Sequence, residues 1–126
     1  MRKLLIVLFC SIIALSACNS PLSITEVKTA PKDLQKVLNV LGMEDYVQMF
    51  NNGEKRSYIV INTKGTVAVS AKSKDDTLVI NIDEVENQNN EVITQHIFKL
   101  TKDVNYEYIY LYKNGEQIPF NTVGSF

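Results

Sequence analysis

The spacing of hydrophobic residues between positions 31 and 50 predicts helical structure. Apolar residues recur there at i, i+3, i+4 and i+7, the positions occupied by Leu34, Val37, Leu38 and Leu41. Pro31 suits the start of a helix and Gly42 suits its end. We therefore predict a helix over residues 31–41, followed by a second short helical stretch over residues 44–50.

After residue 55 the hydrophobic period becomes two, which is the period of a β-strand. The alternation predicts strands at 56–63, 66–72, 77–85, 92–101 and 106–112, and a short last strand at 117–120. Turns are predicted at Lys64-Gly65 and Asp75-Asp76, and a loop at 87–90. Asn114-Gly115 is the strongest hairpin signal in the chain.

Helices followed by closely spaced strands predict an α+β domain over residues 31–126. In this prediction the N-terminal helical segment packs on one face of a five- to six-stranded antiparallel meander. The face expected to receive the helical stripe carries Val67, Val69, Leu78, Ile80 and Ile82. A small β-sandwich or barrel is the alternative fold.

The first 18 residues have the pattern of an export signal. Met1-Arg2-Lys3 is positively charged, and Leu4 to Leu15 is an apolar stretch too short to span a bilayer. The quartet Leu15-Ser16-Ala17-Cys18 resembles the lipobox of bacterial lipoprotein precursors. The resemblance implies cleavage before Cys18 and a lipid on its sulfur. An ordinary secretory signal or an uncleaved helix is the alternative.

This interpretation divides the chain into a signal peptide (1–17), a lipid-anchored tether (18–30) and the folded domain (31–126). The resemblance implies a place on the extracytoplasmic side of the cell membrane. Asn19 follows the cysteine where an Asp resembles an inner-membrane retention signal, so the outer membrane is implied in a two-membrane bacterium.

Composition narrows the function classes. Removing Arg2 and Lys3 from the 13 basic residues leaves 11 against 14 acidic ones, a balance that does not suit nucleic-acid binding. The two cysteines are Cys10 and Cys18. The first would be discarded and the second acylated, so we expect neither a disulfide nor a thiol nucleophile in the domain.

Candidate chemistry is sparse. His96 is the only histidine, which excludes a multi-histidine metal site. Asp83, Glu84 and Glu86 cluster at a strand end but lack the spacing of a calcium loop. Ser57 or Ser70 could be proposed as a nucleophile with His96, but no G-x-S-x-G elbow supports this. We therefore expect no catalytic, cofactor-binding or metal-binding residues and no enzyme.

The unusual feature is a run of alternating tyrosines, Tyr106, Tyr108, Tyr110 and Tyr112. Spacing of two places all four rings on one face of a strand. If Ile109 and Leu111 point inward, the rings face solvent or a partner, and tyrosine is enriched at interfaces. The alternative is that the rings pack against neighbouring side chains, because tyrosine has high strand propensity.

Two segments carry a family resemblance. Thr77-Leu78-Val79-Ile80-Asn81-Ile82-Asp83-Glu84 and Glu91-Val92-Ile93-Thr94-Gln95 resemble the strand–loop–strand pattern of PrcB-like protease-complex accessory domains. The Pro-Tyr usual after the second strand of that family is replaced here by Lys99-Leu100-Thr101. The resemblance implies a non-catalytic, partner-binding role.

The expected function is therefore a lipid-anchored envelope lipoprotein that binds or assists an envelope protein or polymer through its sheet. An immunity-type or inhibitor lipoprotein is one alternative, and a hydrolase is another. The membrane and one such envelope partner are the expected contacts, with no nucleic acid and no cofactor.

Overall fold

The computed structural model describes residues 21–87, 89 and 91–126. The predicted signal peptide, Cys18 and two residues of the 87–90 loop lie outside these residues. The described elements in chain order are β1 (Ser23–Val27), α2 (Lys32–Leu41), β2 (Val47–Asn51), β3 (Arg56–Thr63), β4 (Thr66–Lys74), β5 (Thr77–Val85), β6 (Thr94–Thr101), β7 (Tyr108–Lys113), β8 (Glu116–Ile118) and β9 (Thr122–Ser125).

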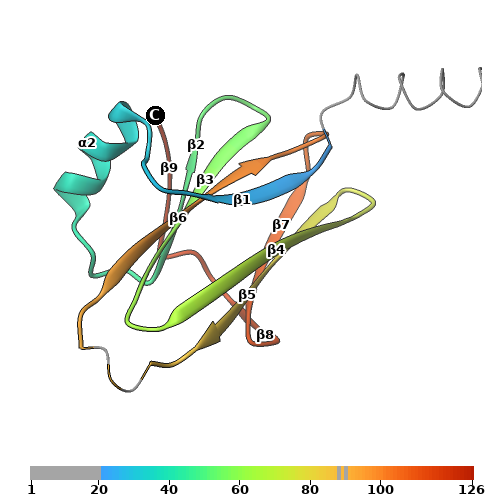
Figure 1. Cartoon of the computed structure of the whole chain (residues 1–126). Coiled ribbons are helices and arrows are strands. Elements are labelled where there is room, and N and C mark those ends of the chain that lie inside the picture. Colours follow the sequence, from blue (N-terminus) through green and yellow to red (C-terminus); the bar gives the residue numbers. More distant parts are fainter. Residues whose placement is uncertain (1–20, 88, 90) are drawn as a thin grey trace, which may run out of the picture.

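The strands form two sheets that face each other (Figure 1). The five-stranded sheet has the order β1-β6-β3-β2-β9, and the four-stranded sheet has the order β4-β5-β7-β8. Both sheets are mixed, because β9 runs parallel to β2 and β7 runs parallel to β5. The fold is therefore mostly β and sandwich-like, and the predicted meander is wrong.

The prediction of a meander is wrong because strands that are consecutive in the sequence often lie in different sheets. Strands β4 and β5 form a hairpin, but the chain then crosses to pair β6 with β3 and returns to place β7 beside β5. Hydrophobic alternation reports which face of a strand is buried and carries no information about its neighbour. The alternative prediction of a small sandwich describes this arrangement.

Two tight turns form where the sequence predicts them. Asn114 and Gly115 both have positive φ, at 50° and 83°, as a type I′ hairpin turn requires. Asp75 also has positive φ, at 55°, in the turn between β4 and β5. These turns keep the predicted hairpins in register, and the observed bounds of β3 and β5 equal the predicted ones.

The main core lies between the two sheets. Its buried members come from strands of both sheets, and they are Val47, Met49, Ile59, Ile61, Leu78, Ile80, Ile82, Phe98, Leu100 and Leu111. Burial of apolar area at this interface is the principal source of stability, since the described domain contains no cysteine.

The helix covers the opposite face of the five-stranded sheet (Figure 1). Leu34 and Leu38 are buried in a second cluster with Phe50, Val60 and Ile97. The prediction that the stripe would pack on Val67, Val69, Leu78, Ile80 and Ile82 is therefore wrong, because the five-stranded sheet packs against that face of the four-stranded sheet. Leu41, the last member of the stripe, is 42 % exposed.

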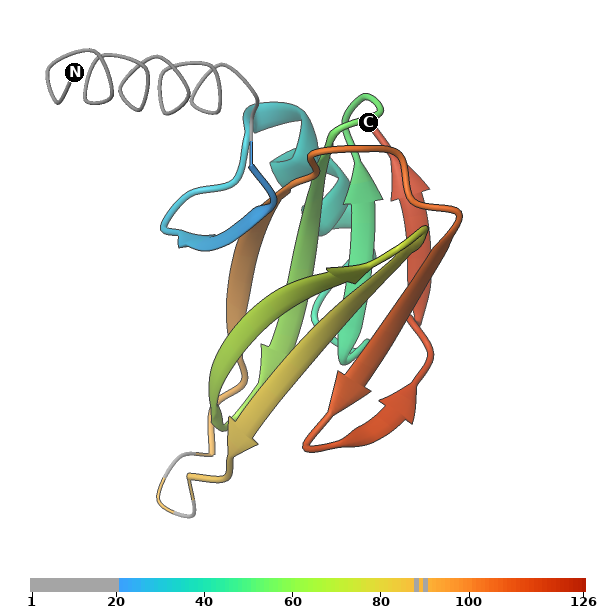
Figure 2. The ribbon, with the colours of Figure 1, turned by 90° about the vertical axis from the view of Figure 1, so that its right-hand side faces the viewer.

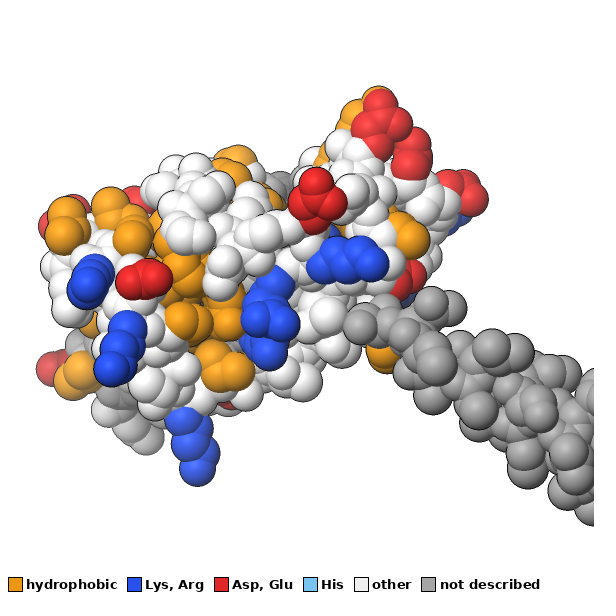
Figure 3. Space-filling view, turned by 90° about the horizontal axis from the view of Figure 1, so that it is seen from above, with side chains coloured by type: hydrophobic (Ala, Val, Ile, Leu, Met, Phe, Trp, Pro, Cys, Tyr) orange, Lys and Arg blue, Asp and Glu red, His pale blue; other side chains and the backbone are white. Residues whose placement is uncertain are grey.

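The helix side also presents apolar side chains to solvent. Val40 is 85 % exposed, and Met43 follows it at 37 %. Seen from above, hydrophobic side chains gather toward the helix side of the molecule with basic side chains around them (Figure 3). Several acidic side chains lie toward the opposite side in the same view.

Residues 47–50, predicted to be helical, lie in strand β2 (Val47–Asn51) instead. Val47 and Met49 face the other sheet, while Gln48 and Phe50 lie on the side that the helix covers. Both faces of β2 are thus buried, and a strand buried on both faces loses its alternation. This is the physical reason for the wrong prediction.

Residues 23–27, predicted to lie in the tether, form strand β1 on the edge of the five-stranded sheet. The strand pairs antiparallel with β6, from Ser23 opposite Thr101 to Val27 opposite Ile97. Its polar composition fits an exposed edge strand. The folded part of the chain therefore begins at least eight residues before the predicted boundary at residue 31.

Candidate functional site

The outer face of the four-stranded sheet carries an aromatic row. Tyr108, Tyr110 and Tyr112 alternate along β7 with Ile109 and Leu111, which point toward the core. Tyr108 is 48 % exposed and Tyr110 is 39 % exposed. Their rings are parallel within 3°, with centroids 6.3 Å apart. We call the surface formed by these three tyrosines the tyrosine face.

Tyr106 does not belong to the tyrosine face, which corrects the prediction that all four rings share one side. Its ring packs against the core between the sheets, and its hydroxyl bonds the Asp103 carboxylate. Strand β7 begins only at Tyr108, after the backbone N–H groups of Glu107 and Tyr108 both bond the carbonyl of Asp76. The strand period therefore does not extend back to Tyr106.

No described helix or strand covers the tyrosine face (Figure 2). The helix packs on the other sheet, so β4, β5, β7 and β8 present their outer side chains to solvent. Strand pairing places Tyr108 beside Thr77 and Tyr110 beside Val79. On the far side of β5, Lys74 lies beside Thr77 and Lys72 beside Val79.

A polar cluster lies at the end of the sandwich where β5 and β7 finish. Tyr46 donates a 3.0 Å hydrogen bond from its hydroxyl to Glu84 Oε1. Lys113 Nζ lies 3.4 Å from Glu84 Oε2 and 4.3 Å from the centroid of the Tyr46 ring. The Glu84 side chain is only 8 % exposed, so this carboxylate depends on its two partners.

Burial and the neighbouring Glu84 carboxylate raise the pKa of Tyr46 far above its ordinary value of 10.0. Desolvation is the larger cause, because it disfavours the phenolate. The hydrogen bond to Glu84 and the negative charge of that carboxylate act in the same direction. Tyr46 therefore stays protonated and donates a hydrogen bond to the buried Glu84 carboxylate, so it does not act as a base.

This shift predicts a loss of stability in alkali. Above about pH 10 the unfolded chain ionises Tyr46 while the folded chain keeps its proton, so stability falls as pH rises. The contribution of one such group is at most about 1.4 kcal/mol per pH unit. Urea unfolding between pH 9 and 11 is expected to show a shallower decline for Tyr46→Phe than for wild type. A Tyr108→Phe control should keep the wild-type slope, and equal slopes for all three proteins would contradict this account.

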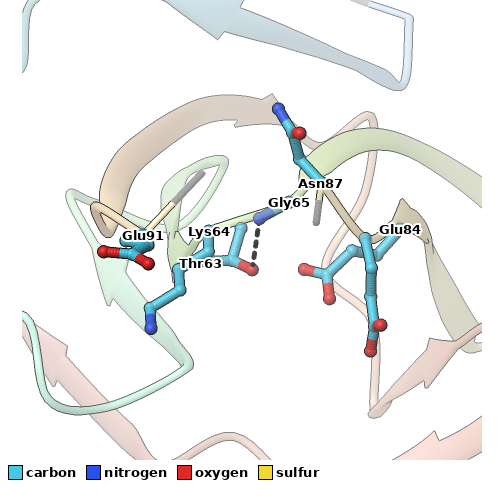
Figure 4. Close-up of a pocket in the computed structure, with 7 residues that line it drawn as sticks. Thr63, Lys64, Gly65, Glu84, Asn87 and Glu91 are labelled. Carbon is cyan, nitrogen blue, oxygen red and sulfur yellow. Dashed lines mark hydrogen bonds between the residues drawn. The ribbon is translucent and has the colours of Figure 1, made fainter. Parts of the chain in front are cut away.

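A pocket of about 440 Å³ opens beside this cluster (Figure 4). It is lined by Thr63, Lys64, Gly65, Glu84, Glu86, Asn87 and Glu91. A Cβ at position 65 would lie 2.6 Å from the carbonyl oxygen of Val85, so the close approach of the two strands requires glycine. The Gly65 N–H donates a 3.1 Å bond to Thr63 Oγ1.

The three acidic residues that cluster in the sequence at this strand end do not lie together in the structure. Asp83 points outward, Glu84 is bound by Lys113, and Glu86 is exposed at the pocket. Within the described residues, no group of three acidic, histidine or cysteine side chains is placed to hold a metal ion. The pocket offers carboxylates to solvent without a defined ligand geometry.

The residues considered for nucleophilic chemistry lie apart. Ser57 is buried and donates a 2.6 Å bond to Asn51 Oδ1. Ser70 is exposed on the other sheet, opposite Asn81. His96 Nδ1 instead lies 3.1 Å from Glu26 Oε2. Neither serine is therefore within reach of an activating histidine, as nucleophilic catalysis requires.

Two features of the surface were not found from the sequence. The pairing of Lys72 and Lys74 with the tyrosine face depends on the order β4-β5-β7, which local patterns do not encode. The Tyr46–Glu84–Lys113 cluster joins residues from three separate segments. For the lysines, the sequence offered one signal, which is the alternation of Lys72 and Lys74 on one face of their strand. No sequence pattern indicated the cluster.

The described residues form a small two-sheet β domain with one short helix, an uncovered aromatic sheet face and a polar end pocket. Comparison of the chain with protein-family models, curated proteins and solved structures found no match. Within the described residues, no helix is both long and apolar enough to cross a membrane.

Proposed function

We propose that this chain is a membrane-anchored cell-envelope lipoprotein that binds an envelope protein or polymer without catalysing a reaction. The observation that carries the binding role is the parallel Tyr108–Tyr110 pair on a sheet face that no described element covers. The anchor rests on the lipobox-like quartet Leu15-Ser16-Ala17-Cys18, which lies outside the described residues.

The start of the fold limits how far an anchored domain would stand from the membrane. Strand β1 begins at Ser23, so the chain from Cys18 to the sheet extends to at most about 18 Å. A lipid on Cys18 would therefore hold the domain close to the headgroups. Two or more acyl chains are needed for durable attachment, since one binds only marginally.

Exposure of the tyrosines supports binding over a purely structural role. Rings that served only to pack the sheet would be largely buried, yet about half of Tyr108 faces solvent. Tyrosine supplies a broad apolar contact with a polar hydroxyl at low entropic cost, which suits recognition. An immunity-type or inhibitor lipoprotein would use the same face and differ only in its partner.

Site-specific photo-crosslinking in the producing bacterium tests this proposal. A photoreactive residue replaces Tyr110 in one strain and Val40, on the helix side, in another. We expect a defined crosslinked product from position 110 and none from position 40, because only the tyrosine face engages the partner. Identical product patterns, or no product from position 110, would overturn the binding role.

The same strains test the anchor through Cys18→Ser. Wild type is expected to incorporate labelled palmitate and to sediment with membranes, whereas the variant should do neither. The position-110 product should also fall sharply in that background, because the domain leaves the membrane surface. Palmitate labelling that persists in Cys18→Ser would contradict the proposed lipid anchor at Cys18.

A further inference from the structure

We propose that two copies of this chain associate by pairing their β4 strands antiparallel, with Ser70 of one copy opposite Ser70 of the other. The pairing joins the two four-stranded sheets into one continuous eight-stranded sheet. This inference goes beyond the proposed function and does not depend on it. It rests on the length of the free edge of β4, the main-chain groups exposed there and the charges on its outer face.

Strand β4 has the longest free edge among the described strands. The other edge strands, β1, β8 and β9, have five, three and four residues, whereas β4 has nine. Proteins protect exposed edges by keeping them short or by placing proline or a bulge there. Strand β4 contains no proline, and its register with β5 is unbroken from Thr66 opposite Val85 to Lys74 opposite Thr77. It is therefore a regular template for a further strand.

The main-chain groups of alternate β4 residues point toward this free edge. On β5, the Ile82 carbonyl and the Glu84 N–H bond Asn114, which follows β7. The main-chain groups of Asp83, between them, therefore point the other way, to Ala68 on β4. Alternation then directs away from β5 the N–H and C=O groups of Val67, Val69, Ala71 and Ser73. None of these groups has a hydrogen-bond partner within residues 21–87, 89 and 91–126.

Strand β1 comes close to β4 and leaves this edge unpaired. Ile24 of β1 packs into the core between the sheets, so β1 approaches β4 from its inner face. In the part of the chain that the structure describes, no strand is hydrogen-bonded to β4 on the side away from β5 (Figure 2). A partner strand would add in the plane of the four-stranded sheet.

Antiparallel pairing centred on Ser70 uses the whole of this edge. Val67 then lies opposite Ser73 of the second copy, and Val69 lies opposite its Ala71. These are the residues whose main-chain groups point outward, so each of them gains a hydrogen-bonded partner. A centre at any other residue would leave part of the nine-residue edge unpaired, which selects this register.

The charges on the outer face match in the same register. Lys72 lies opposite Ala68 of the second copy, and Asp83 lies on the far side of that Ala68. Both charged side chains are exposed, and neither has an ion-pair partner among the described residues. Because Ala68 carries only a methyl group, the Lys72 ammonium of one copy can reach across it to the Asp83 carboxylate of the other.

Twofold symmetry makes this contact twice, which favours a second copy over an unrelated peptide. A parallel in-register pairing would instead bring the two Lys72 side chains together, and like charges opposite each other are unfavourable. The other lysine of this face, Lys74, adjoins Asp75 and Asp76 at the turn, so the argument uses Lys72 and Asp83 alone.

The dimer would also arrange the tyrosine faces. The twofold axis is perpendicular to the joined sheet, so the outer faces of both copies stay on the same side of it. The strand order would be β8-β7-β5-β4 in one copy, continued by β4-β5-β7-β8 in the other. Two tyrosine faces would therefore be presented side by side to whatever binds them.

Disulfide formation at position 70 tests the register. Ser70→Cys is introduced into the full-length protein, and membranes of the producing cells are oxidised with copper phenanthroline and separated by non-reducing electrophoresis. We expect most of the protein to migrate as a dimer, because the two positions face each other with Cα atoms about 4.5 Å apart. Wild type reports any dimer formed through Cys10 or Cys18. A yield no higher than that of wild type would overturn the inference.

Thr66→Cys is the matched control on the same strand and the same face. The two copies of position 66 would lie about 27 Å apart, so we expect no disulfide dimer from this variant alone. Thr66→Cys produced together with Lys74→Cys should give a mixed dimer, because these positions face each other. Equal yields from Thr66→Cys and Ser70→Cys would reflect random collision and overturn the inference. Crosslinking of position 70 to a different protein would also overturn it.

Charge reversal tests the contact between Lys72 and Asp83. Sedimentation velocity of the full-length protein in detergent micelles measures the dimerisation constant. Lys72→Asp or Asp83→Lys is expected to weaken association about tenfold, because each variant brings like charges together twice. Lys72→Asp/Asp83→Lys should return to within about threefold of wild type, and Lys36→Asp on the helix should not differ from it. A wild-type protein that stays monomeric up to about 1 mM, or a double variant as weak as the singles, would overturn the inference.

A folding readout separates lost contacts from lost structure. The five positions substituted on β4 and β5 are exposed, so each variant should keep a cooperative thermal transition close to that of wild type. They are Thr66, Ser70, Lys72, Lys74 and Asp83. Where a charge variant fails to fold, the disulfide result at position 70 decides the outcome alone.

Discussion

Leu34→Ala is expected to lower the free energy of unfolding by about 3 kcal/mol. Leu34 is fully buried between the helix and the outer face of the five-stranded sheet, in the cluster that contains Val60. Truncation removes apolar contacts and leaves a cavity that the sheet cannot close, because the strands beneath Leu34 (β2, β3 and β6) are each paired on both sides. Urea denaturation followed by circular dichroism measures the change.

A double-mutant cycle then tests which sheet the helix covers. Leu34→Ala combined with Val60→Ala is expected to be non-additive by at least about 0.5 kcal/mol, since both residues belong to one cluster. Leu34→Ala combined with Ile80→Ala should be additive, because Ile80 belongs to the core between the sheets. The reverse result would restore the originally predicted helix position.

Val40→Ala serves as the matched control on the same helix. Val40 is 85 % exposed, so its truncation is expected to change stability by no more than about 0.5 kcal/mol. A comparable loss for Val40→Ala and Leu34→Ala would mean that the helix buries a different face from the one described.

Glu84→Ala is expected to cost about 2 kcal/mol. The carboxylate is nearly buried and accepts a bond from Tyr46 while facing Lys113, so its removal leaves a donor and a cation without their partner. Lys113 is about a third exposed, and water therefore screens part of the loss. Equilibrium urea unfolding at pH 7 measures the effect.

Second substitutions separate charge from packing in this cluster. Glu84→Ala/Lys113→Met is expected to recover part of the lost stability, because the unpaired cation is gone. Glu86→Ala, an exposed neighbour at the same pocket, should change stability little. A loss unaffected by Lys113→Met would show that Glu84 acts through packing alone.

Several elements were predicted well from local patterns, including β3, although both of its faces are buried. The helix forms at Lys32–Leu41 between Pro31 and Gly42, as its stripe of leucines indicates. Strands β3 and β5 have the predicted bounds, and Asn114-Gly115 forms its hairpin. In these segments the residues that direct folding are neighbours in sequence, so periodicity and turn chemistry are sufficient.

The candidate site was predicted in part. Alternation placed Tyr108 and Tyr110 on one face opposite the buried Leu111, as the structure has it. Tyr106 departs because the chain bends before β7 and the hydroxyl bonds Asp103. Lys72 and Lys74 join the surface only through the pairing of β4 and of β7 with β5, so their alternation in the sequence could place them on one face of β4 but not beside the tyrosines.

The sequence by itself determined the strand periods, the helix, the turns and the lipobox-like quartet, because each depends on residues a few positions apart. The tertiary structure alone decided that β2 is a strand and that β6 and β7 belong to different sheets. It also decided which sheet face the helix covers and which stays open. These outcomes depend on contacts between segments that are distant in the sequence. The helix and the two sheets could cover one another's apolar faces in several arrangements, and local patterns do not distinguish between these arrangements.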